Sequence, residues 1–101
     1  MFNLPTDQPT ETLDRKQLTT IEFSHDDVLA ADPAAQKVRR AEADRAALLA
    51  NAHQTKATIF FQTADGQTKR VRAHVLGAHA EYLTLKDGML LPLRAVLGFE
   101  A

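Results

Sequence analysis

Residues 55–76, TKATIFFQTADGQTKRVRAHVL, decide the fold of this chain. The first part, Thr55 to Gln62, is rich in β-branched and aromatic residues and predicts a strand. The Asp65–Gly66 pair that follows is typical of a tight hairpin turn. From Thr68 to Leu76, polar and apolar residues alternate, so we expect a second strand with one buried face. The apolar positions of this second strand are Val71, Ala73 and Val75.

Three shorter strands are expected in the rest of the chain. They cover Tyr82 to Lys86, Met89 to Leu93 and Val96 to Glu100, and two of the joining turns contain glycine. Pro92 has no amide hydrogen to donate, so its strand is expected to have a free edge or a bulge there. Five short antiparallel strands within residues 55–101 must curve and close on each other to bury the ends of the sheet. We therefore expect a small β-barrel over this range.

One helix is predicted before the barrel. Asp32 can accept hydrogen bonds from the free amides of a helix start, and Pro33 fits the first helical position. No glycine or further proline occurs before His53, and alanine, the strongest helix former, dominates the segment. The predicted fold class is therefore α+β, with a helix over 33–53 followed by a five-stranded antiparallel small β-barrel. Apolar residues near one face of the helix are expected to pack on the barrel: Val38, Ala41, Leu48, Leu49 and Ala52.

The N-terminal residues differ in composition from the rest of the chain. Residues 1–32 carry seven acidic and two basic side chains, whereas residues 55–101 carry six basic and four acidic ones. The first half of residues 1–32 consists mostly of polar residues and proline, which bury too little apolar area to offset the entropy of ordering. We predict a flexible acidic arm over 1–31 and a single domain over 32–101. Three apolar residues of the arm are candidates for docking on that domain: Leu18, Ile21 and Phe23.

Several classes of function lack a motif in this sequence. The chain has no cysteine, which excludes disulfides, thiol nucleophiles and cysteine zinc sites. Its histidines lack metal-ligand spacing, and Ser24, His25 and Asp26 are consecutive, whereas catalytic triads converge from distant segments. We therefore expect no enzyme activity, no metal or other cofactor and no small-molecule substrate. The apolar runs are too short to span a membrane and the N-terminus shows no export signal, so we expect a cytoplasmic protein without a membrane partner.

Cations gather on one face of the second predicted strand. Arg70, Arg72 and His74 alternate with its apolar residues, and Lys69 lies beside them. Such a row can contact phosphates or an acidic protein surface, although a solvated strand face that discourages aggregation is the simpler alternative. Tyr82 is the aromatic residue expected to point outward and to stack on a base. The candidate residues for binding nucleic acid or a partner are Lys69, Arg70, Arg72, His74, Tyr82, Lys86 and Arg94.

Four short motifs in residues 45–101 resemble known proteins. They are Leu48-Leu49 at the helix end, Ala57 to Phe61 before Asp65-Gly66, Glu81 to Leu85, and Leu93 to Val96. In this arrangement the chain resembles the Sm-like and SH3-like small barrels, most closely the families of the bacterial RNA chaperone Hfq and the Rho-binding antiterminator Rof. It is also similar to small bacterial proteins that share the pattern of Leu85 to Gly88 and Leu91 to Leu93. The Sm family bends its second strand at a glycine, where this chain has Arg70 to Arg72.

Two functions of different class remain open. The first, which the resemblance implies, is a non-catalytic binding module that contacts RNA or an RNA-handling protein. A regulatory role is one version of this hypothesis. The second is a protein-interaction or homo-oligomeric assembly component with no nucleic-acid role, which uses the helix or a sheet edge. Leu76, Met89 and Leu90 are expected at or near the surface of so small a barrel. Self-association would cover these residues, and a monomer in which the helix and the Leu18–Phe23 segment cover them is an equal alternative.

Overall fold

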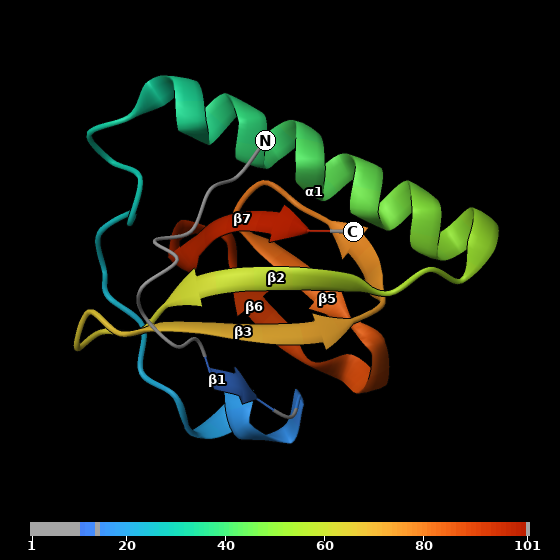
Figure 1. Cartoon of the computed structure of the whole chain (residues 1–101), viewed down its shortest axis with the longest axis horizontal. Coiled ribbons are helices and arrows are strands. Elements are labelled where there is room, and N and C mark those ends of the chain that lie inside the picture. Colours follow the sequence, from blue (N-terminus) through green and yellow to red (C-terminus); the bar gives the residue numbers. More distant parts are fainter. Residues whose placement is uncertain (1–10, 14, 101) are drawn as a thin grey trace.

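The computed structural model describes residues 11–13 and 15–100 and shows an α+β fold (Figure 1). Among these residues one long α-helix, α1 (Pro33–His53), lies against two small sheets. The strands are β1 (Glu11–Leu13), β2 (Ala57–Gln62), β3 (Thr68–Ala73), β4 (Val75–Ala78), β5 (Tyr82–Leu85), β6 (Leu90–Pro92) and β7 (Val96–Glu100). Three short 3₁₀ helices connect them: η1 (Arg15–Thr20), η2 (Lys86–Gly88) and η3 (Leu93–Ala95).

The strands form one sheet of four and one sheet of three. The first has the order β1-β3-β2-β7, and the second has the order β4-β5-β6. β1 runs parallel to β3, whereas the other pairs are antiparallel. The predicted Asp-Gly hairpin is observed between β2 and β3, where Gly66 adopts a φ of 86° and donates its amide to the Thr63 carbonyl.

The five-stranded barrel predicted for residues 55–101 is wrong in its strand count and closure. The described residues of this range form six strands, β2 to β7, whose hydrogen bonds do not join the two sheets into a closed barrel. The strand predicted from Thr68 to Leu76 is two strands, because the chain leaves one sheet at Ala73 and enters the other at Val75. Both sheets face the same core, so the buried alternation runs on through the break and gives the appearance of one strand.

The helix has the predicted bounds but buries a different face. Asp32 accepts a hydrogen bond from the Ala35 amide at 3.0 Å, as expected for a cap, and Gln54 ends the helix in the left-handed conformation. The prediction that Leu48 and its apolar neighbours form the buried face is wrong, since Leu48 is 66% exposed. Small side chains let the helix approach the strands closely, whereas leucine would hold it away. The buried residues are Arg39, Ala43, Ala46 and Ala50.

Part of the predicted N-terminal arm lies against the body. Residues 1–10 and 14 are outside the described residues. In the remainder, Leu18 is 4% exposed, and Ile21 and Phe23 pack on the core as expected for docking residues. Backbone hydrogen bonds fix the segment further, with Ala64 donating to the Glu22 carbonyl at 2.9 Å.

A buried arginine joins this segment to the helix and to β7. Arg39 is 5% exposed, and its two terminal nitrogens donate to the Asp27 carboxylate at 2.8 and 2.6 Å. The Nη1 group also donates to the Val96 carbonyl at 3.0 Å. A buried cation is costly unless it is paired and hydrogen-bonded, and these contacts supply partners for both terminal nitrogens, whereas Nε is buried without a hydrogen-bond partner among the described residues. We call this set of contacts the Arg39 junction.

We expect the Arg39 junction to weaken in acid. The hydrogen bond from Arg39 holds the pKa of Asp27 below its ordinary value, so the ionised carboxylate favours the folded state. This contribution is complete above the pKa of about 3.9 that Asp has in unfolded chains, and it is lost as the pH falls through the lower folded pKa. Urea unfolding across pH should show the stability advantage of the wild type over Asp27→Asn shrinking below about pH 4. An advantage independent of pH would contradict the assignment.

Candidate binding surfaces

Two of the predicted binding residues lie together on the outer face of the four-stranded sheet. Val71 and Ala73 point into the core, so Arg70 and Arg72 point to solvent, and both are exposed. Across the sheet, Arg72 lies opposite Thr58 of β2 and donates from Nη1 to its hydroxyl at 3.3 Å. The structure therefore brings together two cations of the predicted row, which we call the Arg70–Arg72 pair.

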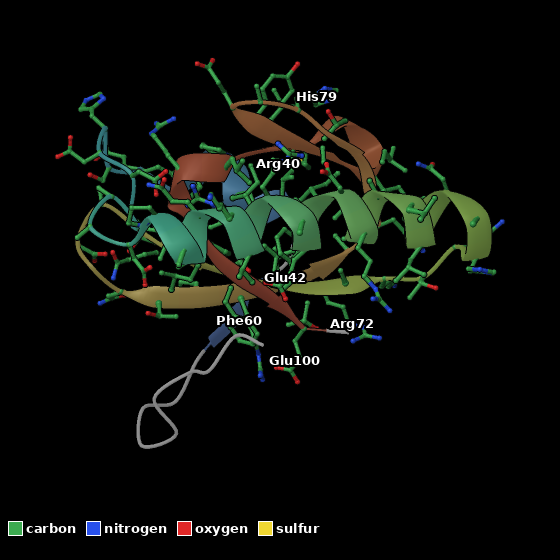
Figure 2. The ribbon with its side chains drawn as sticks, turned by 90° about the horizontal axis from the view of Figure 1, so that it is seen from above. Arg40, Glu42, Phe60, Arg72, His79 and Glu100 are labelled. Carbon is green, nitrogen blue, oxygen red and sulfur yellow. The ribbon has the colours of Figure 1, made fainter. Side chains whose placement is uncertain are left out.

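The outer face is not uniformly basic. Thr58 pairs on its other side with Glu100 of β7, so a carboxylate lies two strands from Arg72. Phe60 occupies the same face but is only 1% exposed, so its ring does not offer a stacking surface. Figure 2 shows Phe60, Arg72 and Glu100 along this side of the molecule, with His79 on the opposite side. The positive charge is therefore concentrated on β3.

Lys69 lies apart from the Arg70–Arg72 pair. It is half-buried and lines a hollow of about 390 Å³ between the η1 segment and the β2–β3 hairpin. Asp65 lines the same hollow, and hydrogen bonds from the Thr63 hydroxyl and the Gln67 amide lower the pKa of its carboxyl. Lys69 therefore faces a carboxylate in a shallow polar hollow.

His74 lies where the chain passes from one sheet to the other. Its Nε2 atom lies 2.8 Å from the Gln54 carbonyl, which connects the end of α1 to the point where β3 gives way to β4. Its Nδ1 atom is buried without a hydrogen-bond partner among the described residues. The ring is half-buried, so it belongs to the helix–sheet contact and not to the exposed row.

Arg94 is also engaged inside the fold. Its Nε group donates to the Ser24 carbonyl at 2.7 Å, and its own carbonyl accepts from the Val28 amide at 2.9 Å. Arg94 therefore holds the segment that the Arg39 junction also holds. No local sequence signal identifies this contact, because Ser24 and Arg94 are 70 positions apart.

Tyr82 belongs to the other sheet, and Lys86 follows it on η2. Tyr82 is 41% exposed on β5, and its ring centroid lies 4.6 Å from that of His79. His79 in turn contacts the Thr84 hydroxyl at 3.1 Å and accepts, through its carbonyl, a hydrogen bond from Arg40 at 2.6 Å. The contact between Arg40 and His79 was not predicted, because no local pattern in the sequence indicates that α1 lies beside the β4–β5 turn. Lys86 is exposed on η2.

The carboxyl groups with shifted pKa values lie in different contacts. Asp27 belongs to the Arg39 junction and Asp65 to the hairpin hollow. On α1, burial raises the pKa of Glu42, which accepts a hydrogen bond from the Phe99 backbone. Each group thus has partners of its own, and the three do not make an acid–base pair. Within the part of the chain that the structure describes, no three His, Asp or Glu side chains gather as metal ligands, and no helix is long and apolar enough to cross a membrane.

Comparison with known proteins adds no relative. No family model, no curated protein and no solved structure matches the chain. The resemblance to Hfq and Rof therefore stays an expectation from the sequence motifs.

The contacts of Arg94 and the exposure of Arg72 predict different effects on stability. Arg94→Ala removes the donor to the Ser24 carbonyl, and we expect a loss of about 1.5–3 kcal/mol in the free energy of unfolding, the range for hydrogen bonds to charged groups. Arg72→Ala removes an exposed side chain and should change stability by about 0.5 kcal/mol or less. Urea titration of both variants measures the difference. Equal losses would show that Arg94 is not a structural residue.

Proposed function

We propose that this chain is a non-catalytic binding module of the cytoplasm that contacts RNA or an RNA-handling protein. The observation that carries the proposal is the Arg70–Arg72 pair, two exposed arginine residues on one face of β3. Residues two apart on a strand are separated by about 6.6 Å, so both cations can meet one chain of phosphates or one acidic surface. Arginine suits this role because its planar fork binds phosphate and carboxylate oxygens in pairs.

The sheet presents this pair in a defined place. Thr58 holds the Arg72 guanidinium by a hydrogen bond, which lowers the entropy lost when a ligand orders that side chain. The remaining candidates divide by their contacts. His74 and Arg94 make contacts inside the fold, and Lys69 lines the hollow beside the hairpin. Tyr82 is exposed on β5 and Lys86 on η2. The proposal therefore assigns ligand contact first to Arg70 and Arg72.

The proposal includes a relationship to the Sm-like and SH3-like small barrels. Its support is the chain path: β3 passes into β4 through the single residue His74, and β7 returns after η3 to pair with β2. The two sheets thus enclose one core, as the halves of an opened barrel would. In place of the expected glycine bend of the second strand, the chain passes from one sheet to the other at His74, whose carbonyl accepts a hydrogen bond from the Lys86 amide.

A titration of labelled single-stranded RNA tests the proposal. The wild type should bind at low salt with an affinity that falls as salt rises, because phosphate contacts release counterions. The Arg70→Ala/Arg72→Ala variant should bind more weakly, and its slope of log affinity against log salt should be shallower by about 0.7 for each lost phosphate contact. Fluorescence anisotropy measures both quantities.

The matched control is Lys37→Ala/Arg45→Ala, which removes two exposed cations from α1. It changes the net charge equally and should leave most of the affinity in place. Equal weakening by both variants would contradict the assignment to β3. A labelled polyglutamate peptide distinguishes the acidic-protein form of the proposal, which predicts that the peptide binds and RNA does not. The proposal fails if neither probe binds at low salt.

A further inference from the structure

The outer face of the three-stranded sheet differs in chemistry from the Arg70–Arg72 face. On β5, Leu83 and Leu85 are both 0% exposed, so Tyr82 and Thr84 point outward. The strand register places Leu90 of β6 directly opposite Thr84. This face therefore presents residues of β5 and β6 to solvent together.

Large apolar side chains occupy this face. Leu76, at the irregularity in β4, is 46% exposed, Tyr82 is 41% exposed and Leu90 is 57% exposed. Leu76 lies next to Gly77, which pairs with Thr84, so all three side chains lie within two strand spacings, about 10 Å across the sheet. We call this set the Leu76–Tyr82–Leu90 patch. Three large apolar residues exposed on one sheet face differ from the isolated exposed leucines that are common on protein surfaces.

His79 completes the patch. A Cβ atom added at Gly77 would lie 2.9 Å from the His79 Nε2 atom, so the imidazole ring lies over this glycine. The same ring packs against Tyr82 and contacts the Thr84 hydroxyl. The contacts hold the Tyr82 ring in place, so little side-chain entropy remains to be lost when the patch is covered.

Charges of both signs lie around the patch. Arg40, which reaches the His79 carbonyl, forms an ion pair with Asp44 at 2.6 Å. Glu81 and Lys86, the residues that flank β5, are both exposed. Among the side chains that the structure describes, two cations and two carboxylates therefore border an apolar centre. A rim of mixed sign does not attract a polyanion, whereas its cations and carboxylates can meet opposite charges on a second copy of the same rim.

We infer that the Leu76–Tyr82–Leu90 patch is the contact surface for a second copy of this chain. Two identical sheets packed face to face interleave their outward residues about 10 Å apart, with their strands nearly aligned. A two-fold contact uses the patch on both copies, so the apolar area removed from water is doubled. The patch is small, so the dimer forms in a concentration range that dilution can cross. This inference is independent of the proposed binding of RNA at β3.

A peptide strand added at the sheet edge is a poorer occupant. β4 and β6 are the edge strands of this sheet; β4 lies against α1, and Pro92 of β6 has no amide hydrogen to offer to an incoming strand. The apolar residues also lie on the face of the sheet and not along that edge. Face packing covers them, whereas strand addition leaves them exposed.

Sedimentation equilibrium over a concentration series tests the inference. The wild-type mass should rise from that of one chain to that of two, whereas Leu76→Gln/Leu90→Gln should stay monomeric over the same range. The control Leu48→Gln removes a leucine that is 66% exposed on α1, outside the patch, and should dimerise as the wild type does. Circular dichroism confirms that each variant is folded. A monomeric wild type at the highest concentration, or equal dimerisation of the double variant, would overturn the inference.

Tyrosine fluorescence gives a second, local readout. Tyr82 is the one tyrosine of the chain and there is no tryptophan, so the intrinsic emission reports from the patch itself. Quenching by acrylamide should fall as the concentration rises through the dimerisation range, and it should stay constant in Leu76→Gln/Leu90→Gln. Dimerisation without any change in the quenching of Tyr82 would place the interface elsewhere and overturn the assignment.

Discussion

The rest of the fold depends on the burial of the Arg39 guanidinium between three parts of the chain. Asp27 supplies the counter-charge from the N-terminal segment, and the Val96 carbonyl supplies an acceptor at the start of β7. The Arg39 side chain is 6% exposed and the Asp27 side chain is 27% exposed, so loss of Asp27 would leave a buried cation without its counter-charge, which is strongly destabilising. The contact therefore couples the three parts of the chain. Ala43, one turn further along α1, is 0% exposed and allows the helix to lie close enough for the contact.

This arrangement determines which surfaces are left for function. Arg39 and Arg94 hold the N-terminal segment in place, so their charges are not offered to a ligand. The Arg70–Arg72 pair lies on one outer sheet face and the Leu76–Tyr82–Leu90 patch on the other, with the core between them. A ligand with negative charge and a second copy of the chain can therefore bind at the same time. The module would then present two basic faces from one dimer, which raises avidity for a ligand long enough to reach both.

Local signals in the sequence account for much of the fold. The Asp32–Pro33 start of the helix and the Asp65–Gly66 turn were both predictable, because their residue types satisfy backbone requirements that hold in any context. The buried face of α1 was not predictable, because alanine occurs on every side of the helix and its large apolar residues indicate a face that the structure leaves exposed. The break at His74 was hidden, because the inward alternation continues across it. The engagement of Arg94 depends on a contact with Ser24 that only the folded chain brings about.

The free energy of unfolding of Arg39→Ala, compared with that of Arg40→Ala, tests the central role of the junction most directly. Both variants remove an arginine of α1 that is ion-paired with an aspartate, but Arg39 is buried and the Arg40–Asp44 pair is largely exposed. The account predicts a loss of about 3 kcal/mol for Arg39→Ala, as for a buried pair broken on one side. It predicts a loss of about 1 kcal/mol or less for Arg40→Ala. Equal and small losses would contradict it.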